Sequence, residues 1–132
     1  MNALREEPRR ALERMLANGP LTAVPKRPSD QDLLVALAAA RFDPAQTYGE
    51  AAVNETLKAW IATFCEPDAI DHVTLRRLLV DSRLMTRTAS GSSYRVDRTK
   101  AGRLEAAEGI DPAAVLAAIR AERAARKKRS SA

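Results

Sequence analysis

Hydrophobic residues recur at helical spacing along most of this chain, and in two short segments they alternate with polar residues instead. The clearest helical pattern follows Gly49, with apolar positions at Val53, Leu57, Trp60, Ile61 and Phe64. Residues three and four apart lie on one face of a helix. We therefore predict an amphipathic helix with Gly49 as its N-cap, and we expect its two aromatic residues to face the core.

Four further segments combine helical spacing with residues that start or stop helices. Serine and aspartate cap the free N–H groups of a first turn, whereas glycine and proline end helices. We predict a helix over residues 8–18, one from Ser29 as N-cap up to Phe42-Asp43-Pro44, one over 71–82 with Asp68 or Asp71 as N-cap, and one from Asp111-Pro112, a cap followed by proline, to about 123. The end of the chain, residues 124–132, is expected to be disordered.

Residues 84–88 and 94–97 alternate in the manner of strands, and a small-residue loop, Ala89-Ser90-Gly91-Ser92-Ser93, separates them. Shorter extended pieces are predicted at 21–24 and 47–48. From residue 29 the order is helix, extended piece, helix, turn, helix and hairpin. This order is typical of a winged helix-turn-helix, in which the hairpin is the wing. A plain helical bundle with an incidental hairpin remains an alternative.

The fold class that we predict is mainly α with a small β-hairpin, a winged helix-turn-helix with added N- and C-terminal helices. The 132 residues suffice for one domain. We divide them into an N-terminal helix and extended segment (1–28), the winged domain (29–98), a linker and C-terminal helix (99–123) and a basic tail (124–132). The terminal helices are the expected surface of a homodimer.

The formal net charge of +5 is unevenly distributed along the chain. Residues 29–70 contain two basic and seven acidic residues, whereas residues 71–103 contain eight basic and three acidic residues. A compact domain with this sequence should have one negative and one positive face. A positive face is typical of a protein that binds a polyanion, most often nucleic acid. On charge alone, a solvated arginine-rich surface is an equal alternative.

The predicted helix 71–82 is apolar on one side and displays arginine on the other. At about 100° per residue, Leu75, Leu78 and Leu79 form its buried stripe and Arg77 lies nearly opposite. The last helix of a helix-turn-helix enters the major groove, where the planar fork of an arginine can bond guanine O6 and N7. We therefore treat helix 71–82 as a recognition helix and the hairpin 84–97 as a wing that contacts phosphates or the minor groove.

The predicted nucleic-acid-binding residues lie on this helix and hairpin: Val73, Thr74, Arg76, Arg77, Arg87, Arg95 and Arg98. The structural alternative is that Arg77 pairs with Asp81, four residues on, and that Arg76 pairs with an acidic group of the preceding helix. Exposed pairs of this kind contribute only about 0.3–0.5 kcal/mol.

Little in the sequence suggests catalysis or metal binding, since the chain has one cysteine and one histidine. Cys65, Asp71 and His72 could be drawn as nucleophile, orienting group and base. No glycine-rich phosphate loop, catalytic carboxylate pair or oxyanion motif accompanies them. We expect no enzyme, no cofactor and no metal site. The absence of a long apolar run or secretion signal predicts a soluble, bacterial-type cytoplasmic protein without a membrane partner.

The middle of the chain, about residues 21–96, resembles a bacterial family classed as a domain of unknown function. Members occur alone or fused behind arsenical-repressor-type DNA-binding domains. The resemblance is carried by Phe42, Pro44, Tyr48, Glu50, Val53-Asn54, Leu57, Asp71, Leu75-Arg76-Arg77, Leu79-Val80-Asp81, Leu84, Arg87, Gly91 and Tyr94. The chain departs from the family pattern at Gly49 and Ala52, so a reciprocal capping box is absent.

The resemblance implies a winged-helix fold and a role in transcription. The expected partner is double-stranded DNA, with RNA or a protein of the transcription machinery as alternatives. Glu50 and Asn54 lie one turn apart on their helix and, in the family interpretation, support the turn or touch a phosphate. The plainer expectation is that Asn54 bonds a loop carbonyl.

Overall fold

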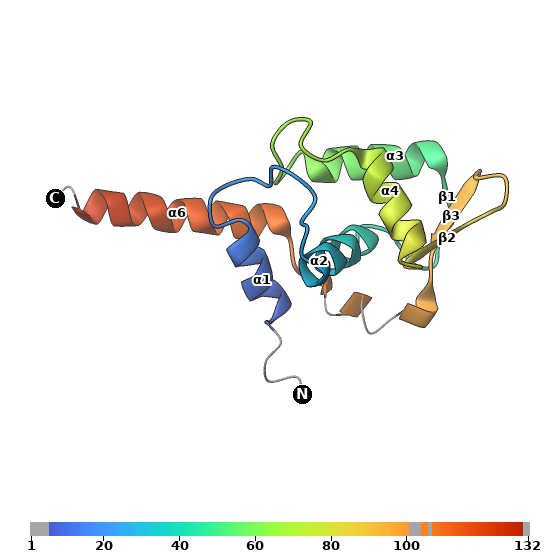
Figure 1. The fold of residues 1–132 in the computed structure, drawn as a ribbon, viewed down its shortest axis with the longest axis horizontal. Helices are drawn as coiled ribbons and strands as arrows, with labels where there is room; N and C mark the ends of the chain where they lie inside the picture. Colours follow the sequence, from blue (N-terminus) through green and yellow to red (C-terminus); the bar gives the residue numbers. More distant parts are fainter. Residues whose placement is uncertain (1–5, 101–103, 106, 131–132) are drawn as a thin grey trace.

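A computed structural model of the chain describes residues 6–100, apart from the side chain of Arg98, and residues 104–105 and 107–130. The protein is mainly helical and carries one small antiparallel sheet (Figure 1). The described α-helices are α1 (Pro8–Met15), α2 (Pro28–Ala39), α3 (Glu50–Ile61), α4 (His72–Asp81) and α6 (Pro112–Ser130). The strands are β1 (Tyr48–Gly49), β2 (Met85–Arg87) and β3 (Ser93–Val96). The predicted mainly helical fold with a β-hairpin is thus confirmed.

The sheet has the order β1-β3-β2, with both pairs antiparallel. The hairpin pairs Met85 with Val96 and Arg87 with Tyr94, and β1 adds the pair Tyr48–Tyr94. Met85, Tyr94 and Val96 are buried, because alternate side chains of a strand share one face. The sequence predicted both hairpin strands and an extended piece at 47–48, but not that this piece joins the hairpin as a third strand.

Helix starts follow the predicted capping chemistry in three cases out of four. Asp111 precedes Pro112 at the start of α6, and its Oδ1 accepts a hydrogen bond from Ala113 N at 3.0 Å. Gly49 is the N-cap of α3, and Asp71 is the N-cap of α4, where its Oδ1 accepts a hydrogen bond from Val73 N at 3.2 Å. Ser29 as the cap of α2 is wrong. The helix begins one residue earlier, at Pro28, and Arg27 is its N-cap without a side-chain bond. A proline fits the first helical position because its φ is fixed and that position has no N–H partner.

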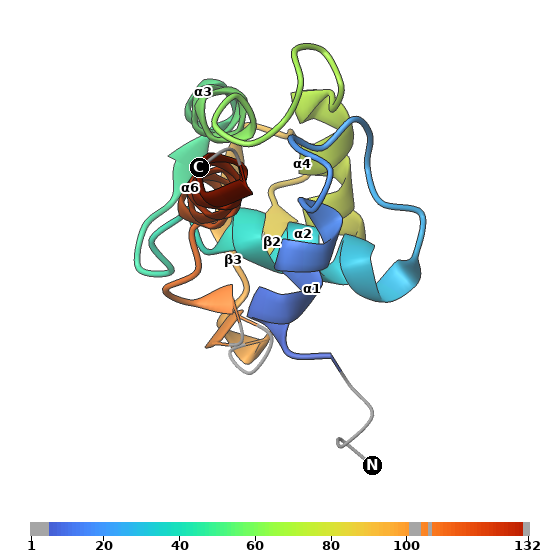
Figure 2. The same ribbon diagram turned by 90° about the vertical axis from the view of Figure 1, so that its left-hand side faces the viewer.

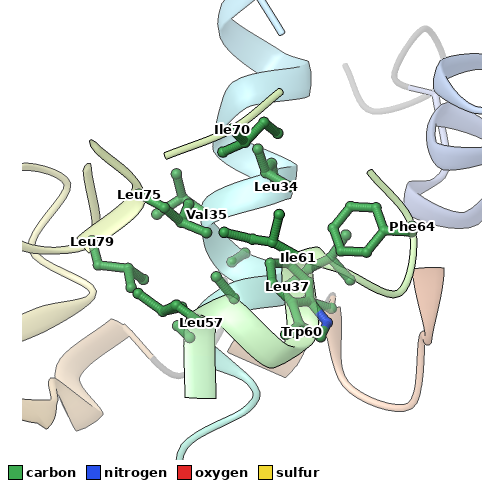
Figure 3. Close-up of a cluster of buried hydrophobic side chains, with 14 of the residues drawn as sticks. Leu34, Val35, Leu37, Leu57, Trp60, Ile61, Phe64, Ile70, Leu75 and Leu79 are labelled. Carbon is green, nitrogen blue, oxygen red and sulfur yellow. The ribbon is translucent and has the colours of Figure 1, made fainter. Parts of the chain in front are cut away.

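Helix α2 lies at the centre of the core, which explains its continuous buried run from Leu34 to Ala39. Figure 3 shows its leucines against residues of two other helices, Leu57, Trp60 and Ile61 from α3 and Leu75 and Leu79 from α4. Full burial of each such side chain contributes about 1.5–3 kcal/mol to folding. Helix α4 is therefore fixed by its leucines to the body of the domain.

Helix α3 ends at Ile61, so Phe64 lies in the turn beyond it and not on the predicted helix. It still packs on Trp60 as an edge-on aromatic pair, with ring centroids 4.7 Å apart, and both residues are buried as predicted. The same turn receives the N-terminal extended segment. Leu21 N donates to Phe64 O at 3.0 Å, and Glu66 N donates to Leu21 O at 2.8 Å.

The C-terminal helix α6 continues to Ser130, although disorder was predicted from residue 124. Alanine, arginine, lysine and glutamate all favour helix, and an ion pair from Arg126 to Glu122 (3.1 Å) joins consecutive turns. Figure 1 shows the second half projecting beyond the body, and Figure 2 looks along this helix from its C-terminal end. Periodicity of apolar residues could not reveal this half, since it buries nothing.

The terminal helices pack on each other within one chain. Leu12 and Leu16, at and just after α1, and Val115 and Leu116 of α6 are buried. Arg123 of α6 also donates to Ala17 O just beyond α1. The apolar faces on which a homodimer was expected are therefore covered by the protein's own chain.

Candidate nucleic-acid interface

Helix α4 presents the two faces that its sequence predicts. Leu75 and Leu79 are fully buried, whereas Thr74 and Arg77 are exposed. Val73 and Val80 are half-buried, and Leu78 is also only half-buried rather than part of the core. The exposed face thus offers a hydroxyl and a guanidinium one turn apart, within the first two turns of α4.

The side chain of Arg77 is exposed on α4. Among the residues that the structure describes, none bonds or pairs with it, so the alternative of a pair with Asp81 is not formed. An exposed arginine without an internal partner has its five N–H donors available for a ligand.

Arg76, the neighbour of Arg77, bonds two side chains of α3 instead of facing solvent. Its Nη2 lies 3.1 Å from Glu50 Oε1, and its Nη1 donates to Asn54 Oδ1. The Arg76 side chain is only 14% exposed, so this contact joins α4 to α3. The structural alternative for Arg76 is the one that the geometry matches. We expected Asn54 to bond a loop carbonyl, but its partner is the Arg76 guanidinium.

The two hairpin arginines face opposite sides of the sheet. Arg95 pairs across the strands with Thr86, and Arg87 pairs with the buried Tyr94. Residues directly opposite in an antiparallel pair share a face, so Arg95 points outward and Arg87 lies on the inner face, beyond the edge of the core. Both side chains are exposed. The Arg87 guanidinium lies next to Gly91 in the hairpin loop.

Arg98 begins the short 3₁₀ helix η2 (Arg98–Lys100), and its side chain lies outside the described part. Asp97, the residue before Arg98, adds a negative charge to this region. Hydrogen bonds from the Thr99 hydroxyl (2.7 Å) and backbone N–H (2.9 Å) hold the pKa of Asp97 below its ordinary value. Asp97 is therefore ionised at neutral pH.

Arg83 is a candidate residue that the sequence did not indicate. It follows the C-cap of α4 with a φ of 64°, and it is exposed. Leu84 N donates to Leu79 O at 3.1 Å and Arg83 N to Val80 O at 3.0 Å, the bonding of a helix that ends in a left-handed residue. Glycine usually occupies such a position, so no sequence signal indicated that Arg83 adopts this left-handed conformation after α4.

The residues of the hypothetical catalytic trio lie near one cavity of about 450 Å³, between the end of α3 and the start of α4. Burial raises the pKa of the Cys65 thiol to about 12, so the thiol is protonated at neutral pH. His72 Nδ1 lies 3.6 Å from Asp71 Oδ1. In the described parts of the chain, no three His, Cys, Asp or Glu side chains gather in a way that could hold a metal ion.

These features define a small helical protein with a three-stranded sheet and a helix, α4, that displays an exposed arginine. Residues 20–96 match the family described as "Uncharacterized protein conserved in bacteria (DUF2087)", and the chain belongs to this family. The match spans α2 to β3 and leaves out α1 and α6, as the resemblance in the sequence indicated. No curated protein and no solved structure matches the chain. None of the helices described is long and apolar enough to cross a membrane.

Proposed function

We propose that this protein is a DNA-binding transcriptional regulator that uses a winged helix-turn-helix. The support comes from the element order α2, β1, α3, α4, β2, β3 with β3 between β1 and β2. In such a domain, α4 is the recognition helix and the hairpin is the wing. The observation that carries the proposal is Arg77, which is exposed on the face of α4 opposite its buried leucines and has no partner in the described part of the chain.

Base recognition would fall to Arg77 and Thr74. A bidentate arginine–guanine contact contributes about 1–3 kcal/mol of discrimination, provided that the helix is held in place. Three groups hold α4: its leucines, the Asp71 cap and the bonds from Arg76 to α3. Arg76 thus has a positioning role in this proposal rather than a contact with a base.

Phosphate contacts would come from the exposed arginines around this helix, which are Arg83 at its C-terminal end and Arg87 and Arg95 on the hairpin. Because Arg87 and Arg95 face opposite sides of the sheet, we expect only one of them to contact the same duplex as α4. Arg95 is the residue on the outer face.

The test begins with selection of bound duplexes from a random library, followed by affinity measurements at several salt concentrations. With two phosphates neutralised, by Arg83 and Arg95, the logarithm of affinity should fall with a slope of about −2 against log salt. Arg77→Ala should reduce the preference for the selected sequence by about 1–3 kcal/mol. Arg95→Ala should weaken all sequences alike and make the slope shallower by about 1.

The matched control is Arg41→Ala, which removes an exposed arginine just beyond α2 and should change neither affinity nor preference. If wild type binds no duplex at low salt and the variants behave identically, the proposal is wrong. The winged domain would then be a protein-interaction module. Tighter binding to single-stranded RNA than to duplex DNA would instead support the RNA-binding alternative.

A further inference from the structure

Helix α6 consists of a packed half and a projecting half. Pro112, Val115 and Leu116 are buried and Ile119 is half-buried, whereas almost every residue after Ile119 is exposed. We call residues 120–130 the arm. At about 1.5 Å per residue, the arm extends roughly 16 Å.

The face that packs in the first half of α6 becomes basic in the arm. Continuing the three-and-four spacing of the packed residues leads to Glu122, Arg123, Arg126 and Lys127, of which three are basic. The arm contains six basic residues and one acidic residue, Glu122. Glu122 lies 3.1 Å from Arg126 and 3.8 Å from Arg129, so a single carboxylate serves two guanidinium groups. Most of the positive charge of the arm is not neutralised by its own carboxylate.

The arm lies far from the proposed recognition surface. In Figure 1 the C-terminal end of α6 and the β2–β3 hairpin lie at opposite ends of the molecule. The arm and the proposed recognition surface are therefore two separate basic regions of the molecule.

We infer that the arm is a second DNA-binding element, which holds the phosphate backbone of a separate duplex segment without reading its sequence. This inference rests on the proposed function, since it makes one molecule bridge two DNA segments. Duplex DNA fits the arm because it carries about one negative charge per 1.7 Å of its axis, and lysine and arginine contact phosphates irrespective of the bases.

A second copy of the chain fits the arm less well, because three of the seven acidic residues in its segment 29–70 already pair with basic side chains. Asp30 is buried and bonds Arg14 at 2.6 Å, and Glu50 pairs with Arg76. Glu55 lies 4.0 Å from Lys58. These internal pairs lower the negative potential that such a surface could offer to the arm of another molecule.

The experiment uses three full-length variants. The arm variant carries Arg120→Gln, Lys127→Gln and Lys128→Gln, which spares Arg123, the residue that bonds Ala17 O. Glutamine keeps a helix propensity close to that of lysine and arginine, and circular dichroism verifies the helix content. The surface variant carries Arg77→Ala and Arg95→Ala. The charge-matched control replaces the exposed Lys26, Arg41 and Lys58 by glutamine.

Bridging is measured as the recovery of a labelled duplex in solution by an identical duplex on beads. We expect recovery with wild type and with the control, and a loss of about tenfold or more with the arm variant, because each lost phosphate contact weakens binding. The arm variant should still prefer the selected sequence. The surface variant should not bridge, but should retain weak, sequence-independent binding at low salt.

The outcomes separate the inference from the proposed function. If the arm variant bridges like wild type, the inference is overturned while DNA binding through α4 stands. If the surface variant keeps the affinity and preference of wild type, the proposed function fails. The remaining case is that the arm binds a second copy of the chain, which light scattering without DNA tests. If wild type is a dimer and the arm variant a monomer, the arm binds a second copy and the inference is overturned.

Discussion

Two adjacent arginines in α4 serve different purposes because consecutive helical residues point about 100° apart. Arg76 turns toward α3 and meets Glu50 and Asn54, whereas Arg77 turns to solvent. The same residue type thus acts once as a tie between helices and once as a candidate contact for a ligand. The sequence alone would not have separated these two roles.

This difference predicts opposite effects of two substitutions. Arg76→Ala should lower the free energy of unfolding by about 1–2 kcal/mol, because Asn54 and Glu50 lose their charged partner. Arg77→Ala should change it by less than about 0.5 kcal/mol, since no described group depends on it. Urea unfolding of both variants measures these values. Equal destabilisation by the two would contradict the assigned contacts.

Arg83 has a backbone conformation that disfavours any residue with a Cβ. Replacing it by glycine should raise the free energy of unfolding by about 0.5–1 kcal/mol, since the relief of strain exceeds the added entropy of the unfolded chain. Arg83→Ala keeps the Cβ and is the matched control, with no expected gain. Thermal unfolding compares the two variants. A gain with alanine as large as with glycine would refute strain as the cause.

At the scale of elements, the placement of α4 depends on the bonding of its first turn. Asp71 Oδ1 accepts from Val73 N at 3.2 Å, and Oδ2 lies 3.5 Å from the Thr74 hydroxyl. The cap therefore holds the exposed Thr74 as well as the helix start. A loose first turn would misplace both proposed base contacts.

Removing this cap should affect stability and recognition together. We expect Asp71→Ala to lower the free energy of unfolding by about 1 kcal/mol, as for other N-cap substitutions, and to weaken DNA preference. Asp71→Ser retains a capping oxygen and should lose much less. Urea unfolding and the duplex assay provide the measurements. If serine is as harmful as alanine, capping is not the role of Asp71.

Element prediction succeeded where the local pattern carried the information and failed where it did not. The apolar spacing of α3 and α4 and the alternation in the hairpin located these elements. The arm of α6 has no apolar stripe, so apolar spacing did not predict its helix, which residue propensities and the ion pair of Glu122 with Arg126 favour. Ser29 looked like a cap, but Pro28 already satisfies the first helical position of α2.

At the scale of the whole molecule, an ion-pair cluster fastens the N-terminal helix to the core. Arg14 of α1 bonds Asp30 of α2 at 2.6 and 3.0 Å and also bonds Glu6. Asp30 is 6% exposed, whereas Arg14 and Glu6 are about 40% exposed at their side chains (40% and 38%). Hydrogen bonding to Arg14 lowers the pKa of Glu6.

Arg14→Ala should therefore lower the free energy of unfolding by about 1–3 kcal/mol, chiefly because the buried Asp30 carboxylate loses its partner. The double variant Arg14→Ala with Asp30→Ala should lose less than the sum of the single substitutions, because the unpaired charge is then absent. Urea unfolding of the four proteins gives this coupling. Strict additivity would show that the two residues do not depend on each other.

The sequence by itself determined the helices, the hairpin and the outward direction of Arg77, because these follow from periodicities within a few residues. It also indicated the family through its central motifs. Only the tertiary structure decided that Arg76 bonds two residues of α3, that Tyr48 pairs with Tyr94, and that the terminal helices cover each other. These contacts join residues far apart in the chain, and their partners are fixed only when the hydrophobic faces of several elements pack around α2.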